Sequence, residues 1–342
     1  MTRSAILTIS VSLCLAWLLG YSPAALAAGD GTIEGRVVNG TAAGPVPANV
    51  PVALHAVRDR DNIQSRQLTT DTAGNFVVSG LETDPGVVYV AIATYGQAKY
   101  PPSEPVKLDG QPRRSVTITV YEPTSSQDVI TYDRANLLVL DAGPSTVNVM
   151  EMGALVNRSD RTLVGKADTG LPALRFSLPA GAFAVTPRTG FSQADLIPTT
   201  DGFASADPIP PGRHELAFSY QIPVTNGVVD LQRRLAYPAD ALTIYVPQTG
   251  IRLTSAQLTP QGESEIGGQR FDLYAARDVA AGTEISARLV GLPSNGLSPG
   301  QISAIVLSGG GVLLIIGLAL AIRRASNRPA SVETGSVALG SD

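Results

Sequence analysis

The sequence predicts an all-β protein with two consecutive β-sandwich domains and one C-terminal transmembrane helix. Short runs rich in Val, Thr and Ile, with alternating apolar and polar residues, recur between residues 31 and 292. Glycine and proline, which bound these runs, account for 34 and 25 of the 342 residues, and charged residues for only 16%. The helix is predicted from an uncharged apolar run at 302–322.

Residues 1–28 have the pattern of a secretory signal peptide. A basic start at Arg3 precedes an apolar run, and small residues precede the polar pair at 29–30, so we expect cleavage after Ala27 or Ala28. An N-terminal membrane anchor, the alternative, needs a longer apolar run. The only cysteine, Cys14, lies in this segment, so the mature chain is expected to have no disulfide, thiol nucleophile or thiolate metal site.

Residues 29–122 are predicted to form the first β-sandwich, with about seven short strands. Between two of these strands lies TTDTAGNFVVSG, in which Asp71 can accept hydrogen bonds from following amides and Gly74 can adopt a positive φ. A calcium loop, the alternative, requires further oxygen ligands and a closing Glu, which do not follow. The cluster is therefore predicted to be a turn that leads into the strand beginning near Phe76.

Three segments of this domain resemble the carboxypeptidase regulatory-like domain, a transthyretin-like β-sandwich. They are GTIEGRVVNGTAAGPVPANVPVALHAV, TTDTAGNFVVSGL and VVYVAIATYGQAKY. The resemblance implies a non-catalytic accessory module, with Asp71, Gly74 and Phe76 as its turn motif. In metallocarboxypeptidases a separate domain holds zinc through a His-x-x-Glu pair, which neither His55 nor His214 begins here.

A short linker at 123–128 is predicted to lead into a second, immunoglobulin-like sandwich at 129–292, with eight to ten strands. Alternation in one of its strands predicts a dry face and a wet face. The dry face is expected to hold Leu216, Phe218 and Tyr220, and the wet face Glu215, Ala217 and Ser219. Glu263 and Glu265 are expected in a Gly-rich loop.

The C-terminal part is predicted to anchor the chain in the cell membrane. A stalk at 293–301 leads to the transmembrane helix at 302–322, and Arg323 and Arg324 form the membrane stop. The arginines place the tail, 323–342, in the cytosol and the N-terminal ectodomain outside it. Small residues four apart within the span permit a weak homodimer through it.

The best candidates for ligand contact are Tyr95, Gln97 and Tyr100, which lie in a predicted loop with two aromatic rings and one amide. Aromatic rings of this kind stack on the apolar faces of sugars, although ring packing at a strand end is the alternative. The two histidines lie one in each domain, and His55 is expected on a solvent-facing position. No catalytic residue, metal site or cofactor is predicted.

These features favour a non-enzymatic single-pass membrane protein that presents two β-sandwiches outside the cytosol. Its partner is expected to be an unknown envelope protein, bound through sheet edges and loops for interaction or scaffolding. The alternative is a membrane-anchored carbohydrate-binding module whose partner is a glycan. A net charge of −4 without a basic patch argues against nucleic acid. A hydrolase is a third hypothesis and the least favoured, because only two histidines are available for acid–base chemistry.

Overall fold

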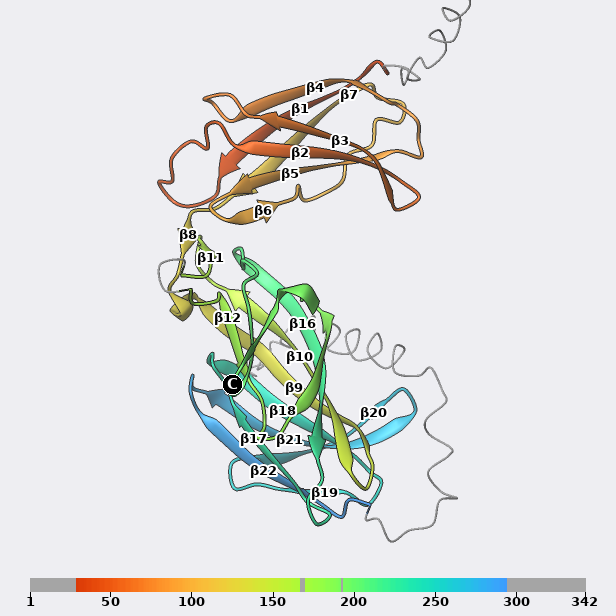
Figure 1. The fold of residues 1–342 in the computed structure, drawn as a ribbon, viewed down its shortest axis with the longest axis vertical. Coiled ribbons are helices and arrows are strands. Elements are labelled where there is room, and N and C mark those ends of the chain that lie inside the picture. Colours follow the sequence, from red (N-terminus) through yellow and green to blue (C-terminus); the bar gives the residue numbers. More distant parts are fainter. Residues whose placement is uncertain (1–28, 167–169, 192, 294–342) are drawn as a thin grey trace, which may run out of the picture. The chain divides into compact units, whose positions relative to one another are not determined.

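The computed structural model describes residues 29–166, 170–191 and 193–293, shown in Figure 1. Within these ranges the regular elements are β-strands and two short 3-10 helices, so the all-β prediction is confirmed there. No helix in these ranges is long and apolar enough to cross a membrane. The signal peptide at 1–28, nearly all of the stalk, the transmembrane helix at 302–322, and Arg323 and Arg324 lie outside the described residues.

Contacts divide the described chain into two units. The first comprises residues 29–95 and 99–120, and the second comprises residues 96–98 and 121–293. In the first unit one sheet has the strand order β4-β1-β7 and the other β3-β2-β5-β6 (Figure 1). The strand bounds are β1 (Gly31–Asn39), β2 (Pro51–Arg58), β3 (Asp61–Thr69), β4 (Asn75–Leu81), β5 (Val88–Tyr95), β6 (Ala98–Tyr100) and β7 (Arg113–Val120).

The two sheets of the first unit enclose one apolar core. Alternation along β1 places Ile33 and Val37 inside, where they are 0% and 1% exposed, and β2 and β5 contribute Leu54 and Ala91 from the facing sheet. Gly35 leaves space for the ring of Phe76, because a Cβ there would lie 1.9 Å from that ring. The unit is thus a β-sandwich.

The second unit contains the remaining strands and both 3-10 helices. Their bounds are β8 (Pro123–Thr124), η1 (Gln127–Val129), β9 (Ile130–Ala142), β10 (Thr146–Asn157), β11 (Thr162–Leu163), β12 (Leu174–Ser177), β13 (Phe183–Thr189), η2 (Gln193–Asp195), β14 (Leu196–Thr199), β15 (Gly202–Ser205), β16 (Gly212–Pro223), β17 (Val229–Arg234), β18 (Ala239–Pro247), β19 (Arg252–Thr254), β20 (Thr259–Ile266), β21 (Gln269–Val279) and β22 (Glu284–Val290).

One wide sheet, two narrow sheets and the two-stranded pair β11-β8 form this unit. The wide sheet has seven strands in the order β13-β16-β10-β9-β18-β21-β20, and the narrow sheets are β12-β15-β14 and β17-β22-β19. Apolar side chains of both narrow sheets, such as Phe176 and Leu231, belong to the same core cluster as Val149 and Phe218 of the wide sheet. The narrow sheets therefore form a divided second layer over one face of the wide sheet.

Four details differ from the sequence-based expectation. The described part of the second unit has fifteen strands, β8 to β22, rather than eight to ten, because several of them are only two to four residues long. The predicted linker at 123–128 contains β8, which pairs with β11 and so belongs to the second unit. Glu263 and Glu265 lie on β20 rather than in a loop, because β20 is an edge strand exposed along most of its length and has no apolar alternation. The predicted wet residue Ala217 is only 4% exposed.

Candidate functional site

The core of the second unit contains a buried ion pair between Glu151 and Arg233. Glu151 lies on β10 of the wide sheet and Arg233 on β17 of a narrow sheet, so the pair joins the two layers. The Arg233 Nε atom lies 2.8 Å from Glu151 Oε1, and the two side chains are 2% and 5% exposed, respectively. A pair this deeply buried requires further hydrogen bonds to offset the loss of hydration.

Those hydrogen bonds are present on both sides of the pair. Arg233 Nη2 donates to Glu151 Oε2 at 2.9 Å, which makes the contact bidentate. Tyr220 donates its hydroxyl to Glu151 Oε1 at 2.9 Å. Arg233 Nη1 donates to the carbonyl oxygen of Arg234 at 2.7 Å and also to that of Ser177. The charges are therefore compensated within the core.

Tyrosines around the pair stay protonated at neutral pH. Burial, followed by the negative charge of Glu151, raises the pKa of Tyr220 well above its usual value. Burial also raises the pKa of Tyr132, and that of Tyr237 to about 12. Burial, the largest single effect, would lower the pKa of Arg233, but attraction to Glu151, the hydrogen bond with it and smaller contributions of the nearby tyrosines together raise the pKa. The cluster fixes charges in place, which is a structural role.

Sequence reasoning missed this pair, although the sequence contains its signal. In β10 the alternation places Glu151 on the same face as Val147 and Val149. In β17 it places Arg233 on the same face as Val229 and Leu231. Two opposite charges, each on a strand face that is otherwise apolar, predict a buried pair.

Side chains close to the ion pair also link the two narrow sheets. Ser177 ends β12 and donates its hydroxyl to the carbonyl oxygen of Arg234 on β17 at 3.0 Å. Tyr237 follows β17, and its hydroxyl oxygen accepts the backbone N–H of Arg175 at 2.9 Å. Side chains thus bridge the junction of these sheets, where the topology has no strand ladder.

A groove of about 460 Å³ opens at this junction. Segments 177–182 and 199–202 form one side, and Gln232, Arg234 and Glu284 form the other. A second, shallower hollow of about 530 Å³ lies over β17, β19 and β22 and also includes Gln232. The two hollows meet at this residue and are the candidate functional site.

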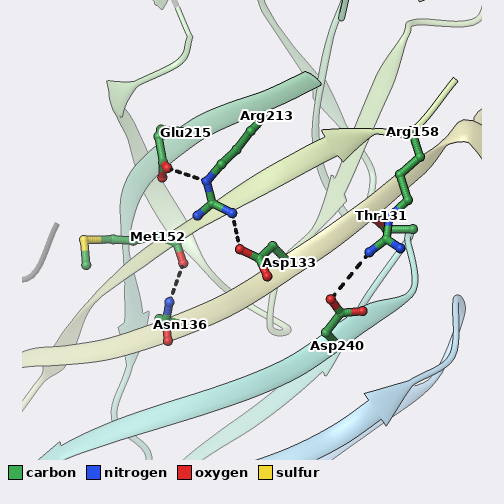
Figure 2. A network of polar contacts seen from close by, with 8 residues as sticks. All are labelled: Thr131, Asp133, Asn136, Met152, Arg158, Arg213, Glu215 and Asp240. Atoms are coloured by element: carbon green, nitrogen blue, oxygen red, sulfur yellow. Dashed lines mark hydrogen bonds and ion pairs between the residues drawn. The ribbon is translucent and has the colours of Figure 1, made fainter. Parts of the chain in front are cut away.

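The outer face of the wide sheet, opposite the core, carries charged residues at one end (Figure 2). Arg213 contacts Asp133 on β9 and donates to Glu215 at 2.9 Å, while Arg158 lies 3.5 Å from Asp240. These pairs are partly or largely exposed, so each contributes little to stability. They form a polar surface that crosses β16, β9 and β18.

Beyond this polar surface the same face becomes apolar. Asn136, whose amide donates to the carbonyl oxygen of Met152 at 3.4 Å, lies at the boundary (Figure 2). A second core cluster follows there, separate from the main core. Its buried members are Leu138, Met150, Met152, Ala217, Ile266 and Phe271. The wide sheet is therefore apolar on both faces over part of its area, which explains the burial of Ala217.

The predicted ligand-contact residues are placed at the end of β5 and on β6. Gln97 is exposed, with φ +72° in the turn between these strands, and Tyr95 is partly buried. Tyr100 is only 3% exposed and belongs to the core of the first unit, so its ring offers no face for stacking. Ligand contact at Tyr95 and Gln97 stays a prediction.

The Asp71–Asn75 segment reverses the chain between β3 and β4. Asp71 Oδ1 accepts the backbone N–H groups of Ala73 and Asn75 at 2.9 and 2.7 Å, and Gly74 has φ +83°. The hydrogen bond from the Asn75 backbone is the largest cause of the lowered pKa of Asp71. All of the carboxylate contacts seen here serve the turn. Among the described residues, no group of three or more His, Cys, Asp or Glu is placed to hold a metal ion.

Comparisons with known proteins assign no family. No family model and no curated protein matches the chain, so the carboxypeptidase regulatory-like resemblance is not confirmed. The M1 zinc metallopeptidase from Deinococcus radiodurans is 12% identical, with a TM-score of 0.29, over 48% of this chain and 43% of its own. The major pilin SpaA of Corynebacterium diphtheriae is 13% identical, with a TM-score of 0.20, over 77% of this chain and 84% of its own. Similarity this low carries no argument about function.

Proposed function

We propose that the chain is a non-enzymatic single-pass membrane protein that presents its two β-sandwich units outside the cytosol to bind an envelope protein. The observation that carries this proposal is the open edge of β7 in the first unit. β7 pairs with β1 in parallel through eight consecutive residues, from Arg113 to Val120, without a register shift. Within the described part of the chain, β1 is its only ladder partner.

A regular edge strand of this length is a template for another strand. From Val116 to Val120 the sequence is VTITV, which has no charge and no proline, and its buried and exposed side chains alternate at the start. Main-chain hydrogen bonds along such an edge give affinity, and pockets for alternate side chains give specificity. We therefore assign strand addition at β7 as the mode of partner binding.

Three other edges, those of β4, β13 and β20, are protected. Arg66 donates to the carbonyl oxygens of Ser79 and Gly80 at 2.7 and 3.0 Å, which covers part of the β4 edge. β13 contains Pro187 and β20 contains Pro260, and the pairing of each with its neighbour shifts register. Proline and bulges are the usual means of preventing strand addition, and β7 has neither.

We also propose that the first unit is a carboxypeptidase regulatory-like, transthyretin-like domain. Its two sheets of three and four strands, with Phe76 packed on Gly35 after the Asp71 turn, support this assignment. For the second unit, the two-layer β architecture supports the immunoglobulin-like assignment. Its seven-stranded sheet and divided second layer nevertheless differ from the usual seven- or nine-strand pattern.

Strand addition is tested by affinity capture. The full chain in detergent is used to capture its partner from membranes, and the amount of captured partner is compared between variants. Thr117→Lys adds a charge at an exposed position of β7 and is expected to abolish capture. Thr69→Lys makes the same change at an exposed position of β3 and is expected to leave capture of the partner intact. Hydrogen exchange should show slower exchange of amides 113–120 in the complex. Equal capture by both variants, or protection confined to other segments, would contradict the proposal.

Membrane topology needs a separate test. Protease added to intact spheroplasts should remove the two units and spare an epitope in the tail at 323–342. Removal of the tail epitope instead would reverse the proposed orientation.

A further inference from the structure

The outer face of β17 and β22 carries three rows of polar side chains. The strand register sets Arg234 opposite Glu284, Gln232 opposite Ser286, and Asp230 opposite Arg288. Arg234 lies 3.0 Å from Glu284, and Arg288 lies 2.7 Å from Asp230. All six side chains are exposed, because their neighbours along each strand face the core.

The central row, formed by Gln232 and Ser286, is available to a ligand. Neither the Gln232 amide nor the Ser286 hydroxyl makes a hydrogen bond to another described residue, whereas the flanking charges are paired with each other. The two hollows of the candidate site lie on either side of this row and share Gln232. From Arg234 to Asp230 the strand advances about 13 Å, so the surface has room for an elongated molecule.

One wall of the second hollow is held in place by side chains. Ser255 donates its hydroxyl to the carbonyl oxygen of Ser286 at 2.8 Å. The Gln257 amide donates to the carbonyl oxygen of Glu284 and accepts the N–H of Ser286, both at 2.7 Å. These contacts fix segment 255–257 against the part of β22 that β19 does not pair with. The hollow is therefore preformed, which lowers the entropic cost of binding.

The chemistry of the surface fits a neutral molecule with many hydroxyl groups. The carboxylates accept hydrogen bonds, and the guanidinium groups of Arg234 and Arg288 donate them. The side chains of Gln232 and Ser286 can do both. The charges of the three rows cancel, and Asp201 adds a negative charge to the groove, which disfavours an anion. Leu178, Ala182 and Val185 supply apolar contact in the groove.

We propose that the outer face of β17 and β22, from the 199–202 segment to the 254–256 segment, binds a neutral, linear glycan. This site is distinct from the Tyr95 and Gln97 positions, and it does not depend on strand addition at β7. The central Gln232–Ser286 row hydrogen-bonds the middle sugar, and the two hollows receive its neighbours.

The experiment is calorimetric titration of the full chain in a detergent without sugar head groups. The probes are cellotetraose, the tetramer of N-acetylglucosamine, their monosaccharides, and tetragalacturonate as the anionic control. We expect a neutral tetramer to bind with a Kd of about 1 mM or tighter, and more tightly than its monosaccharide and the anionic tetramer. The proposal is overturned if neither neutral tetramer binds, or if tetragalacturonate binds as tightly as the neutral tetramers.

Variants locate the site. Gln232→Ala removes the amide that is proposed to hydrogen-bond the sugar and is expected to weaken binding roughly tenfold. Gln67→Ala makes the same change at an exposed position of β3 and is expected to have no effect. Both positions are exposed, so folding should be retained, as the thermal unfolding midpoint will show. Loss of binding in Tyr95→Ala but not in Gln232→Ala would place the glycan elsewhere and contradict the proposal.

Discussion

Arg233 and Glu151 form a bidentate ion pair in the core of the second unit, where almost no water reaches either side chain. Because the two residues come from different layers, the pair fixes how those layers meet. It also holds the carbonyl oxygen of Ser177, at the edge of the groove. The proposed glycan-binding surface therefore depends on a charge pair beneath it.

Removing the arginine charge should strongly destabilise the second unit. In Arg233→Met, Glu151 remains buried without its counter-ion, and we expect the free energy of unfolding to fall by about 3–5 kcal/mol. Arg234→Met removes only an exposed pair with Glu284, and its expected cost is below about 1 kcal/mol. Urea denaturation of both variants measures the difference. Equal costs would mean that the buried pair is no more important than a surface one.

Replacing both charges should restore much of the lost stability. Glu151→Leu combined with Arg233→Met leaves no unpaired buried charge, so the double variant is expected to be more stable than Arg233→Met alone. The same denaturation series tests this. The two single variants, Arg233→Met and Glu151→Leu, complete the comparison. If the double variant loses as much free energy of unfolding as the two single variants added together, the pair interaction is not the cause.

Stability should fall in alkali between about pH 10 and pH 12. The pKa of Tyr237 is raised from 10.0 to about 12 in the folded protein, chiefly by burial. The unfolded chain therefore loses this proton first, so the contribution is complete below pH 10 and declines as pH rises toward 12. Two pH units correspond to about 2–3 kcal/mol for this group. Denaturation at several pH values should show a smaller decline in Tyr237→Phe; an unchanged decline would exclude Tyr237 as a source.

Two glycine substitutions should separate steric conflict from backbone strain. Gly74 and Gly80 have φ of +83° and +70°, so alanine is strained at both. A Cβ at Gly74 would lie 2.5 Å from the carbonyl oxygen of Val37, whereas nothing lies within 4 Å at Gly80. We expect Gly80→Ala to cost about 1–2 kcal/mol and Gly74→Ala to cost more. Thermal unfolding that ranks Gly80→Ala as the worse variant would contradict this turn geometry.

Much of the local structure could be predicted from alternation alone. The segments expected as strands around Ile33 and Leu54 are strands, because each buries one face more deeply than the other. The segment around Phe218 is also a strand, although its second face is buried at Ala217. β20 could not be predicted in this way, since as a sheet edge it has polar side chains on nearly all positions. β6 was also missed, because a strand of three residues is too short to show a period.

The candidate site could not be predicted from the sequence. The residues of the central row, Gln232 and Ser286, are 54 positions apart and belong to strands whose patterns look ordinary. Only antiparallel pairing with a particular register places them side by side. The sequence directed attention instead to Tyr95, Gln97 and Tyr100, because aromatic rings near a glycine resemble a binding loop, and the burial of Tyr100 is a property of the folded core.

The sequence by itself determined the all-β class, the reversal at Asp71 and the position of many strands, because these depend on residues close together in the chain. The alternation marks Glu151 and Arg233 as buried charges, but only the tertiary structure decided how they meet across the two layers. The tertiary structure alone also decided the divided second layer and the face that brings Gln232 beside Ser286. The reason is physical: strand order and register join residues far apart in sequence, and their stability comes from side chains packed across layers rather than from any local preference.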